Sequence, residues 1–152
     1  MKYPKENNSI CILVCIESLT KDKGLSYHDM WLAWSDLFCA INTPVYILTT
    51  NTPDENQSIQ TRFHSSMHYY SDKELTIFKI LACYKEKQVF SKKHSIVYPY
   101  SFILYQNKIH KTYKRMNHKQ ISQLFLDVLE LKYILFVKQF KQKITQNLSN
   151  PE

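Results

Sequence analysis

Apolar and polar positions alternate in blocks along the chain, and each block has the length of one strand or helix. Residues 10–16 (ICILVCI) form an unbroken apolar run and residues 45–48 (VYIL) form another, which is typical of strands buried on both faces of a sheet. Ser26 followed by Asp29 has the form of a helix capping box. The apolar spacing after it predicts a helix that buries Met30, Trp34, Leu37, Phe38 and Ile41.

The middle of the chain predicts two more helices and a short strand. Residues 52–63 begin with a threonine cap, a proline and an acid, the usual order at a helix start. Ser71 and Glu74 repeat the capping pattern before a helix that is expected to run to about Tyr84. Residues 67–70 form a strand candidate between these helices, and the charged residues 85–94 are expected to form a loop.

The last third predicts a hairpin and a long helix. A strand at 95–105, a turn at 106–108 and a returning strand at 109–113 are followed by a helix at 120–143 and a frayed end from Asn147. The order β-α-β-α-(β)-α-β-β-α predicts an α/β fold. Its sheet is mixed, with helices on both faces, because strands joined through helices are parallel and strands joined by a tight turn are antiparallel. The length of 152 residues fits a single domain, 1–152.

The charge pattern alone does not indicate a nucleic-acid surface, and a codon bias toward lysine would produce the same shortage of arginine. Lys and Arg total 20 against 13 Asp and Glu, a net charge of +7, but only Arg62 and Arg115 carry the rigid fork that reads phosphates and bases. The basic segment 108–119 is either a phosphate-contacting patch or a lysine-protected sheet edge, and we favour the edge. Because Gly24 is the single glycine, glycine-rich dinucleotide and phosphate loops are excluded.

The cysteines and histidines indicate no metal site or other cofactor. The four cysteines have no zinc-binding spacing, and His64 and His68 form a metal-like pair without a nearby acid. No secretory signal is apparent, so a reducing cytoplasm and free thiols are expected. Acidic and lysine residues interrupt the apolar stretch 124–140, and we therefore expect no membrane span.

Two stretches of the chain resemble a known family. Residues 70–75 (YSDKEL), within 44–84, and residues 101–109, within 100–113 (YSFILYQNKIHKTY), carry the sharpest likeness. With the element order, they resemble peroxiredoxins of the alkyl hydroperoxide reductase and thiol-specific antioxidant type, in the thioredoxin superfamily. The resemblance implies a thioredoxin-like fold with a core at 8–131 and a basic helical extension at 132–152. It also implies an antioxidant function, the thiol-dependent reduction of peroxides.

The reactive position departs from that family. The family has a Thr or Ser, then two residues, then the peroxidatic cysteine at the first turn of the helix after the first strand, where the helix N-terminus stabilises the thiolate. Here no cysteine lies between Cys15 and Cys39, and the alignment places Ser26 or Tyr27 where the sulfur belongs. Serine cannot pass through sulfenic acid. The resemblance therefore implies a degenerate site around Thr20, Ser26 and Tyr27.

Pro99 and two thiols complete the candidate residues. The resembled family has an arginine just before the penultimate strand, and this position falls at about Pro99 here. Pro99 is similar to another branch of the superfamily, in which a cis proline offers backbone to a partner's extended chain; the alternative is an ordinary proline at the start of a strand. Cys83, near a predicted helix end, matches a resolving cysteine of some peroxiredoxins. For Cys83 and Cys39 a structural or incidental thiol is favoured over a catalytic one.

We therefore hypothesise a degenerate peroxiredoxin-like protein, with no peroxidase chemistry or a weak activity from a displaced thiol. The alternative is a non-enzymatic binding module that holds a protein or nucleic-acid partner through the basic hairpin and the C-terminal helix. A thiol oxidoreductase using Cys39 or Cys83 ranks last. Expected partners are a thioredoxin-like reductant, another protein or a second copy in a homodimer, with nucleic acid disfavoured.

Overall fold

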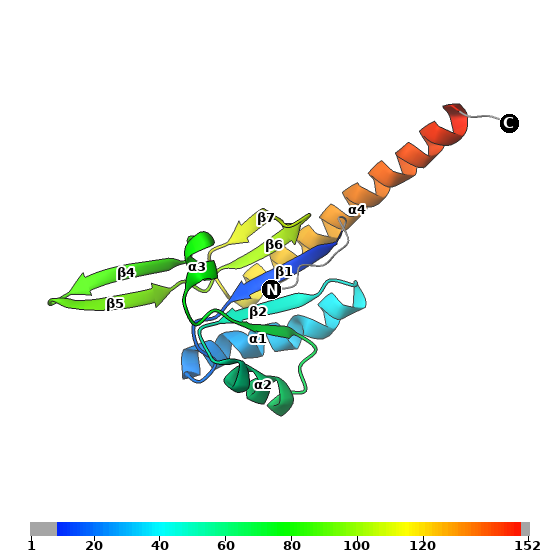
Figure 1. Ribbon diagram of the computed structural model, residues 1–152. Helices are drawn as coiled ribbons and strands as arrows, with labels where there is room; N and C mark the ends of the chain where they lie inside the picture. Colours follow the sequence, from blue (N-terminus) through cyan, green and yellow to red (C-terminus); the bar gives the residue numbers. More distant parts are fainter. Residues whose placement is uncertain (1–8, 150–152) are drawn as a thin grey trace.

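A five-stranded mixed sheet forms the centre of the computed structural model, which describes residues 9–149 (Figure 1). The strand order is β3-β2-β1-β6-β7. The strands are β1 (Ile10–Cys15), β2 (Val45–Thr49), β3 (His68–Ser71), β6 (Ser101–Tyr105) and β7 (Lys108–Tyr113). β1, β2 and β3 run parallel, whereas β6 is antiparallel to both β1 and β7. The predicted mixed sheet and final hairpin are confirmed; residues 1–8 and 150–152 of the predicted domain lie outside the described residues.

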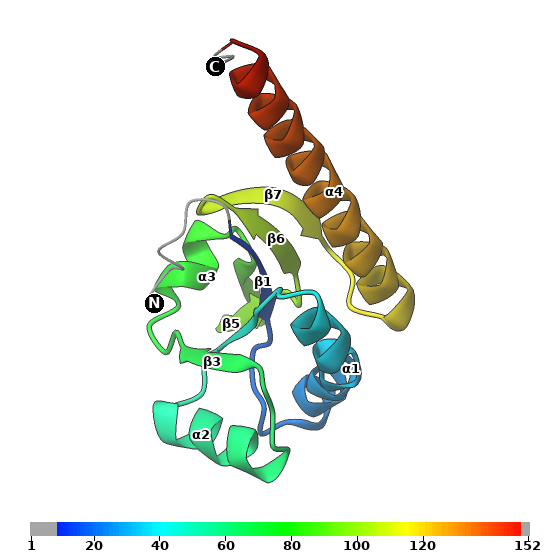
Figure 2. The ribbon, with the colours of Figure 1, turned by 90° about the vertical axis from the view of Figure 1, so that its right-hand side faces the viewer.

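Helices cover both faces of this sheet, as predicted (Figure 2). Helices α1 (Asp22–Ala40), α2 (Pro53–Arg62) and α4 (His118–Ser149) contribute to the core on one face, and the short α3 (Thr76–Ile80) packs on the other. Alternate residues of β1 serve the two sides, because successive side chains of a strand point in opposite directions. Ile12 contributes to the α1 and α4 side, whereas Leu13 contributes to the α3 side.

Helix α1 begins at Asp22, one turn earlier than predicted. Ser26 therefore lies inside the helix, and the predicted capping box at Ser26 is wrong. The predicted apolar stripe is only partly right, because Phe38 is buried but Leu37 is 48% exposed. The buried residues of α1 are Gly24, His28, Trp31, Ser35 and Phe38. Hydrophobic spacing does not detect Gly24, His28 and Ser35, because these three are not apolar.

The predicted capping box at the start of α2 is confirmed, whereas the one predicted at Ser71, before α3, is not. The Thr52 hydroxyl accepts from the Glu55 amide and the Glu55 carboxylate accepts from the Thr52 amide. Ser71 instead belongs to β3, so the second predicted capping box is wrong. The Asp72 carboxylate accepts from the Phe78 amide at 2.8 Å, in the first turn of α3. The helix ends at Ile80 and Ala82 follows with a positive φ, so the predicted helix to Tyr84 is wrong.

A second hairpin replaces the predicted charged loop. β4 (Tyr84–Val89) pairs with β5 (Lys92–Val97) in a separate two-stranded sheet that projects from the body (Figure 1). Phe90 and Ser91 both have positive φ, as in the two-residue turns that suit hairpins. The predicted continuous strand at 95–105 is also wrong, because the chain leaves β5 and enters β6 on either side of Pro99.

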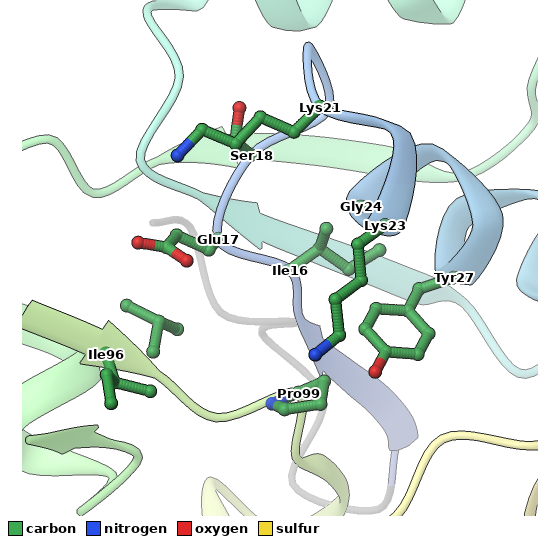
Figure 3. Close-up of a pocket in the computed structure, with 10 residues that line it drawn as sticks. Ile16, Glu17, Ser18, Lys21, Lys23, Gly24, Tyr27, Ile96 and Pro99 are labelled. Carbon is green, nitrogen blue, oxygen red and sulfur yellow. The ribbon is translucent and has the colours of Figure 1, made fainter.

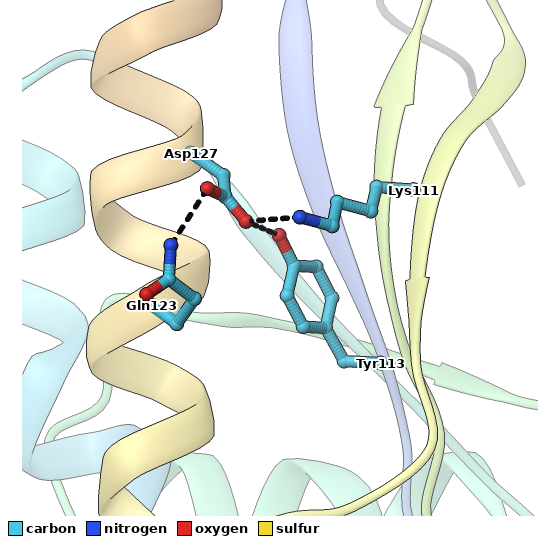
Figure 4. A network of polar contacts seen from close by, with 4 residues as sticks. All are labelled: Lys111, Tyr113, Gln123 and Asp127. Carbon is cyan, nitrogen blue, oxygen red and sulfur yellow. Dashed lines mark hydrogen bonds and ion pairs between the residues drawn. The ribbon is translucent and has the colours of Figure 1, made fainter.

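Helix α4 is attached to β7 by a polar network (Figure 4). The Asp127 carboxylate accepts from Lys111 at 2.8 Å, from Gln123 at 2.9 Å and from the Tyr113 hydroxyl. The helix continues to Ser149, so the predicted frayed end from Asn147 is wrong within the described residues. Among the helices of residues 9–149, none is both long and apolar enough to cross a membrane.

Candidate functional site

A pocket of about 180 Å³ lies where β1 ends and α1 begins (Figure 3). Two of the predicted site residues, Tyr27 from α1 and Pro99 from the segment before β6, meet in its wall. The lining residues are Ile16, Glu17, Ser18, Lys21, Lys23, Gly24, Tyr27, Ile96, Val97 and Pro99. The pocket therefore lies between Tyr27, in the region where the resemblance places the reactive site, and Pro99 in the opposite wall.

The loop between β1 and α1 is held rigidly from the neighbouring strand end. The Leu19 amide donates to the Asn51 side-chain oxygen at 2.7 Å, and the Thr50 hydroxyl donates to the Glu17 carbonyl at 2.6 Å. Gly24 then lets the helix backbone approach the loop, because a Cβ at this position would lie 1.6 Å from the Ser18 carbonyl oxygen. The single glycine of the chain thus fixes where α1 starts.

The other predicted residues lie around this pocket or away from it. Thr20 is exposed on the loop, where its hydroxyl shares a 2.8 Å hydrogen bond with Ser18. Ser26 is exposed and does not line the pocket. The peptide bond that precedes Pro99 is trans, because residues 9–149 contain no cis peptide bond. The interpretation of Pro99 as a cis proline is therefore wrong.

The first turn of α1 presents a lysine to the pocket. Lys23 extends past the Tyr27 ring toward Pro99 (Figure 3), with its Nζ 6.0 Å from the ring centroid. Lys21 adds a second ammonium group, against the single carboxylate of Glu17. The N-terminal end of a helix also carries a partial positive charge. The pocket is therefore suited to a negatively charged group.

Cys39 is remote from this pocket. It is exposed near the C-terminal end of α1, where it lines a different cavity with Pro44 and His68. At 1.5 Å per helical residue, Cys39 lies about 24 Å along the helix from Lys23. The structure does not bring this candidate thiol to the predicted site.

Cys83 pairs with a residue that the sequence did not connect to it. Its Sγ lies 3.7 Å from the Sγ of Cys15, and both side chains are fully buried. The hydrogen bond with Cys83 and burial together raise the pKa of the Cys15 thiol well above its ordinary value. Burial also raises the pKa of Cys11, to about 11. No sequence signal indicates the Cys15–Cys83 contact, because the two residues are 68 positions apart and meet only through the fold.

The metal-like pair of histidines is divided between two elements. His64 follows α2 with a positive φ, and His68 lies on β3 with its ring stacked on Tyr46. Among residues 9–149 no group of three histidine, cysteine or acidic side chains is arranged to hold a metal ion.

His28, which follows Tyr27 on α1, is a buried polar residue that the sequence did not indicate. His28 is fully buried, and its Nε2 is 2.6 Å from the Tyr69 hydroxyl on β3. Burial lowers the pKa of His28 and outweighs the opposing effect of Asp29, whose carboxylate lies 3.8 Å from Nδ1. His28 does not line the pocket, and it connects α1 to the edge of the sheet.

Comparison with known proteins gives structural matches only. No protein-family model and no curated protein sequence matches the chain. The bacterioferritin comigratory protein of Xanthomonas campestris is 10% identical, with a TM-score of 0.70 over 82% of this chain and 80% of that one. Peroxiredoxin Q of Xylella fastidiosa is 12% identical, with a TM-score of 0.70 over 83% and 79%.

A third similar structure is peroxidoxin BcpB of Mycobacterium tuberculosis, at 8% identity and a TM-score of 0.64 over 78% of this chain and 77% of that one. At these identities the likeness concerns the fold. It agrees with the fold that the element order predicted. The chain has a mixed α/β, thioredoxin-like fold that is similar to the folds of these three proteins.

Proposed function

We propose that this chain is a degenerate peroxiredoxin-like protein in which the former reactive pocket no longer reduces peroxide. One observation carries the proposal. Lys23 stands three residues after Thr20, the spacing at which the resembled family has its peroxidatic cysteine, and its side chain extends into the pocket. Ser26 and Tyr27, which the alignment placed at the sulfur, follow in the second turn.

The chemistry supports a loss of the peroxidatic step. Peroxide reduction begins when a thiolate attacks the O–O bond, so that sulfur becomes sulfenic acid and the alcohol or water leaves. A protonated lysine has no lone pair for this attack and no such redox cycle. Cys39 is about 24 Å away along α1, and Cys15 and Cys83 are buried against one another. None of these thiols lines the pocket.

A binding role is the second candidate, and the charge of the pocket favours it. Lys21, Lys23 and the N-terminus of α1 would pair with a carboxylate or another anionic group of a protein partner, and Pro99 would contact its extended backbone. The β6–β7 hairpin supports a nucleic-acid partner less well, because Lys111 is already engaged by Asp127. We place this protein in the cytoplasm, as one domain with free thiols and the helical extension at 132–152.

A peroxide-reduction assay coupled to thioredoxin and its reductase tests the proposal. We expect no turnover by the wild type and none by a Cys39→Ser/Cys83→Ala variant. Turnover by the wild type that disappears in the double variant would contradict the proposal and favour a thiol oxidoreductase.

A gain-of-function pair tests which position corresponds to the missing sulfur. In Lys23→Cys the new thiol lies in the first turn of α1, so the helix N-terminus and Lys21 should lower its pKa. We expect it to form a trappable sulfenic acid with hydrogen peroxide about tenfold faster than the matched Ser26→Cys variant. Faster reaction of Ser26→Cys would support the alignment on Ser26. If neither variant forms sulfenic acid, the proposal that this pocket is the former reactive site is contradicted.

A further inference from the structure

Helix α4 has a second apolar face that no part of the described chain covers. Its inner face contributes Ile121, Leu124, Val128 and Leu131 to the core. The outer face exposes large apolar residues at intervals of three and four: Leu126, Leu129, Tyr133, Phe136, Phe140, Ile144 and Leu148. Phe136 is 65% exposed and Leu148 is 75% exposed. We call these seven residues the outer stripe.

The outer stripe is long and continuous. At 1.5 Å per residue it extends about 33 Å along the helix from Leu126 to Leu148. The rings of Phe136 and Phe140 stack on one another with centroids 6.3 Å apart. Figures 1 and 2 show the C-terminal part of α4 projecting well beyond the sheet, and residues 138–149 are all exposed. Exposed apolar faces of this size mark an interaction site.

The charges beside the stripe are all positive in this projecting half. Residues 131–149 contain four lysines, Lys132, Lys138, Lys141 and Lys143, and no acidic residue. At 100° per residue, Lys141 and Lys143 lie about 80° to either side of Tyr133. Lysines therefore border the apolar stripe on both flanks, where their ammonium groups can reach a surface on which the stripe lies.

This charge pattern favours an anionic surface over a second copy of α4 as the binding partner of the outer stripe. In a pair of identical helices packed through the stripe, each copy would bring four lysines and only Glu130 as a free acid, since Asp127 is held by Lys111. Like charges would then meet along most of the interface. An anionic surface under the stripe attracts Lys141 and Lys143, on its two flanks, at the same time, and the chain as a whole carries +7.

We propose that the outer stripe of α4 binds the surface of an anionic lipid bilayer, with the helix lying in the plane of the interface. The apolar residues would enter the boundary between headgroups and acyl chains, and the flanking lysines would pair with headgroup phosphates and carboxylates. The folded body lies on the opposite face of the helix, so it stays on the aqueous side. This inference does not depend on the pocket at α1.

Co-sedimentation of the full chain with vesicles tests the proposal. We expect binding to phosphatidylcholine vesicles that contain phosphatidylserine, little binding to phosphatidylcholine alone, and loss of binding as salt increases. Phe136→Ser/Phe140→Ser and Lys141→Glu/Lys143→Glu should each weaken binding by about tenfold or more. Since all four side chains are exposed, circular dichroism and thermal unfolding should show these variants to be folded.

A matched control separates the helix from net charge. Lys87→Glu/Lys92→Glu changes the total charge by the same amount on the β4–β5 hairpin, and it should leave vesicle binding within about twofold. An equal loss in this control would contradict a specific role for α4. Absence of binding to anionic vesicles would overturn the proposal, and light scattering would then distinguish a dimer formed through the stripe from a monomer available to an acidic protein.

Discussion

Helices α1 and α4 pack against the same face of the sheet but differ in what their outer faces carry. Four outward positions of α1 are small or acidic (Ser26, Asp29, Ala33 and Asp36), and Leu37 is the one large apolar residue that α1 exposes. The outward positions of α4 form the apolar outer stripe with lysines on its flanks. Both inner faces supply buried side chains to one core. Of the large apolar residues that the two helices expose, α1 carries only Leu37, whereas α4 carries the seven residues of the outer stripe together with Ile134. This difference supports the proposed membrane role of α4.

The largest expected effect contrasts a phenylalanine on each helix. Phe38 of α1 is fully buried and contacts Trp31 and Phe125, whereas Phe140 of α4 is 55% exposed. Phe38→Ala should lower the free energy of unfolding by about 4 kcal/mol, because it leaves a cavity in the core. Phe140→Ala should change it by less than about 0.5 kcal/mol. Urea denaturation measures both, and a comparable loss at Phe140 would show that the outer stripe is covered within the folded protein.

The second effect concerns the close contact of Gly24, near the start of α1, with the Ser18 carbonyl; α4 contains no glycine and has no such contact. Gly24→Ala places a Cβ against the Ser18 carbonyl and forces the loop and helix apart. We expect a loss of about 3 kcal/mol, at the upper end of overpacking penalties. The matched control Ala33→Gly, at an exposed position of the same helix, should cost about 1 kcal/mol. If Gly24→Ala unfolds at the same urea concentration as the wild type, this close contact does not determine the helix start.

The third effect tests how α4 is attached to β7. Asp127→Asn removes the charge that accepts from Lys111, Tyr113 and Gln123, and should cost about 2 kcal/mol. Partial burial raises the pKa of Asp127, but these three hydrogen bonds outweigh it and hold the pKa below 3.8. The stabilisation should therefore be present above pH 3.8 and disappear as the pH falls through the lowered value. The difference between wild type and variant should narrow in acid, whereas a constant difference would contradict a role for the charge.

The parts of the fold that could be predicted are those whose stability depends on burial. β1 and β2 appear in the sequence as apolar runs because both of their faces are covered. The β4–β5 hairpin has mostly exposed side chains, so its formation by backbone pairing leaves no hydrophobic pattern. After α3 ends at Ile80, Ala82 has a positive φ and the Cys83 amide donates to the Phe78 carbonyl, and a capping motif at Ser71 does not indicate this early end.

The site could be predicted only in part for a related reason. The resemblance brought Tyr27 and Pro99 into one region, and they do line one pocket. Assigning Lys23 to the pocket requires the start of α1 at Asp22, which no side-chain cap marks, since Lys21 provides none. The backbone contact of Gly24 depends on where the preceding loop returns, and residue spacing carries no information about that.

The smallest expected effect is a change in the pH dependence of unfolding caused by His28, a titratable residue on the inner face of α1 that has no counterpart on the inner face of α4. The inner face of α4 is wholly apolar, whereas α1 buries His28, whose Nδ1 has no hydrogen-bond partner among the described residues. Burial holds the pKa of His28 below 6.5, so the unfolded chain takes up a proton before the folded chain does. The free energy of unfolding should therefore fall as the pH decreases from 6.5 toward the lowered pKa. His28→Gln keeps a group that can hydrogen-bond to Tyr69 and should flatten this dependence, while the exposed His110→Gln should leave it unchanged. Urea denaturation at several pH values measures the slopes, and equal slopes for all three proteins would mean that His28 is accessible to protons in the folded state.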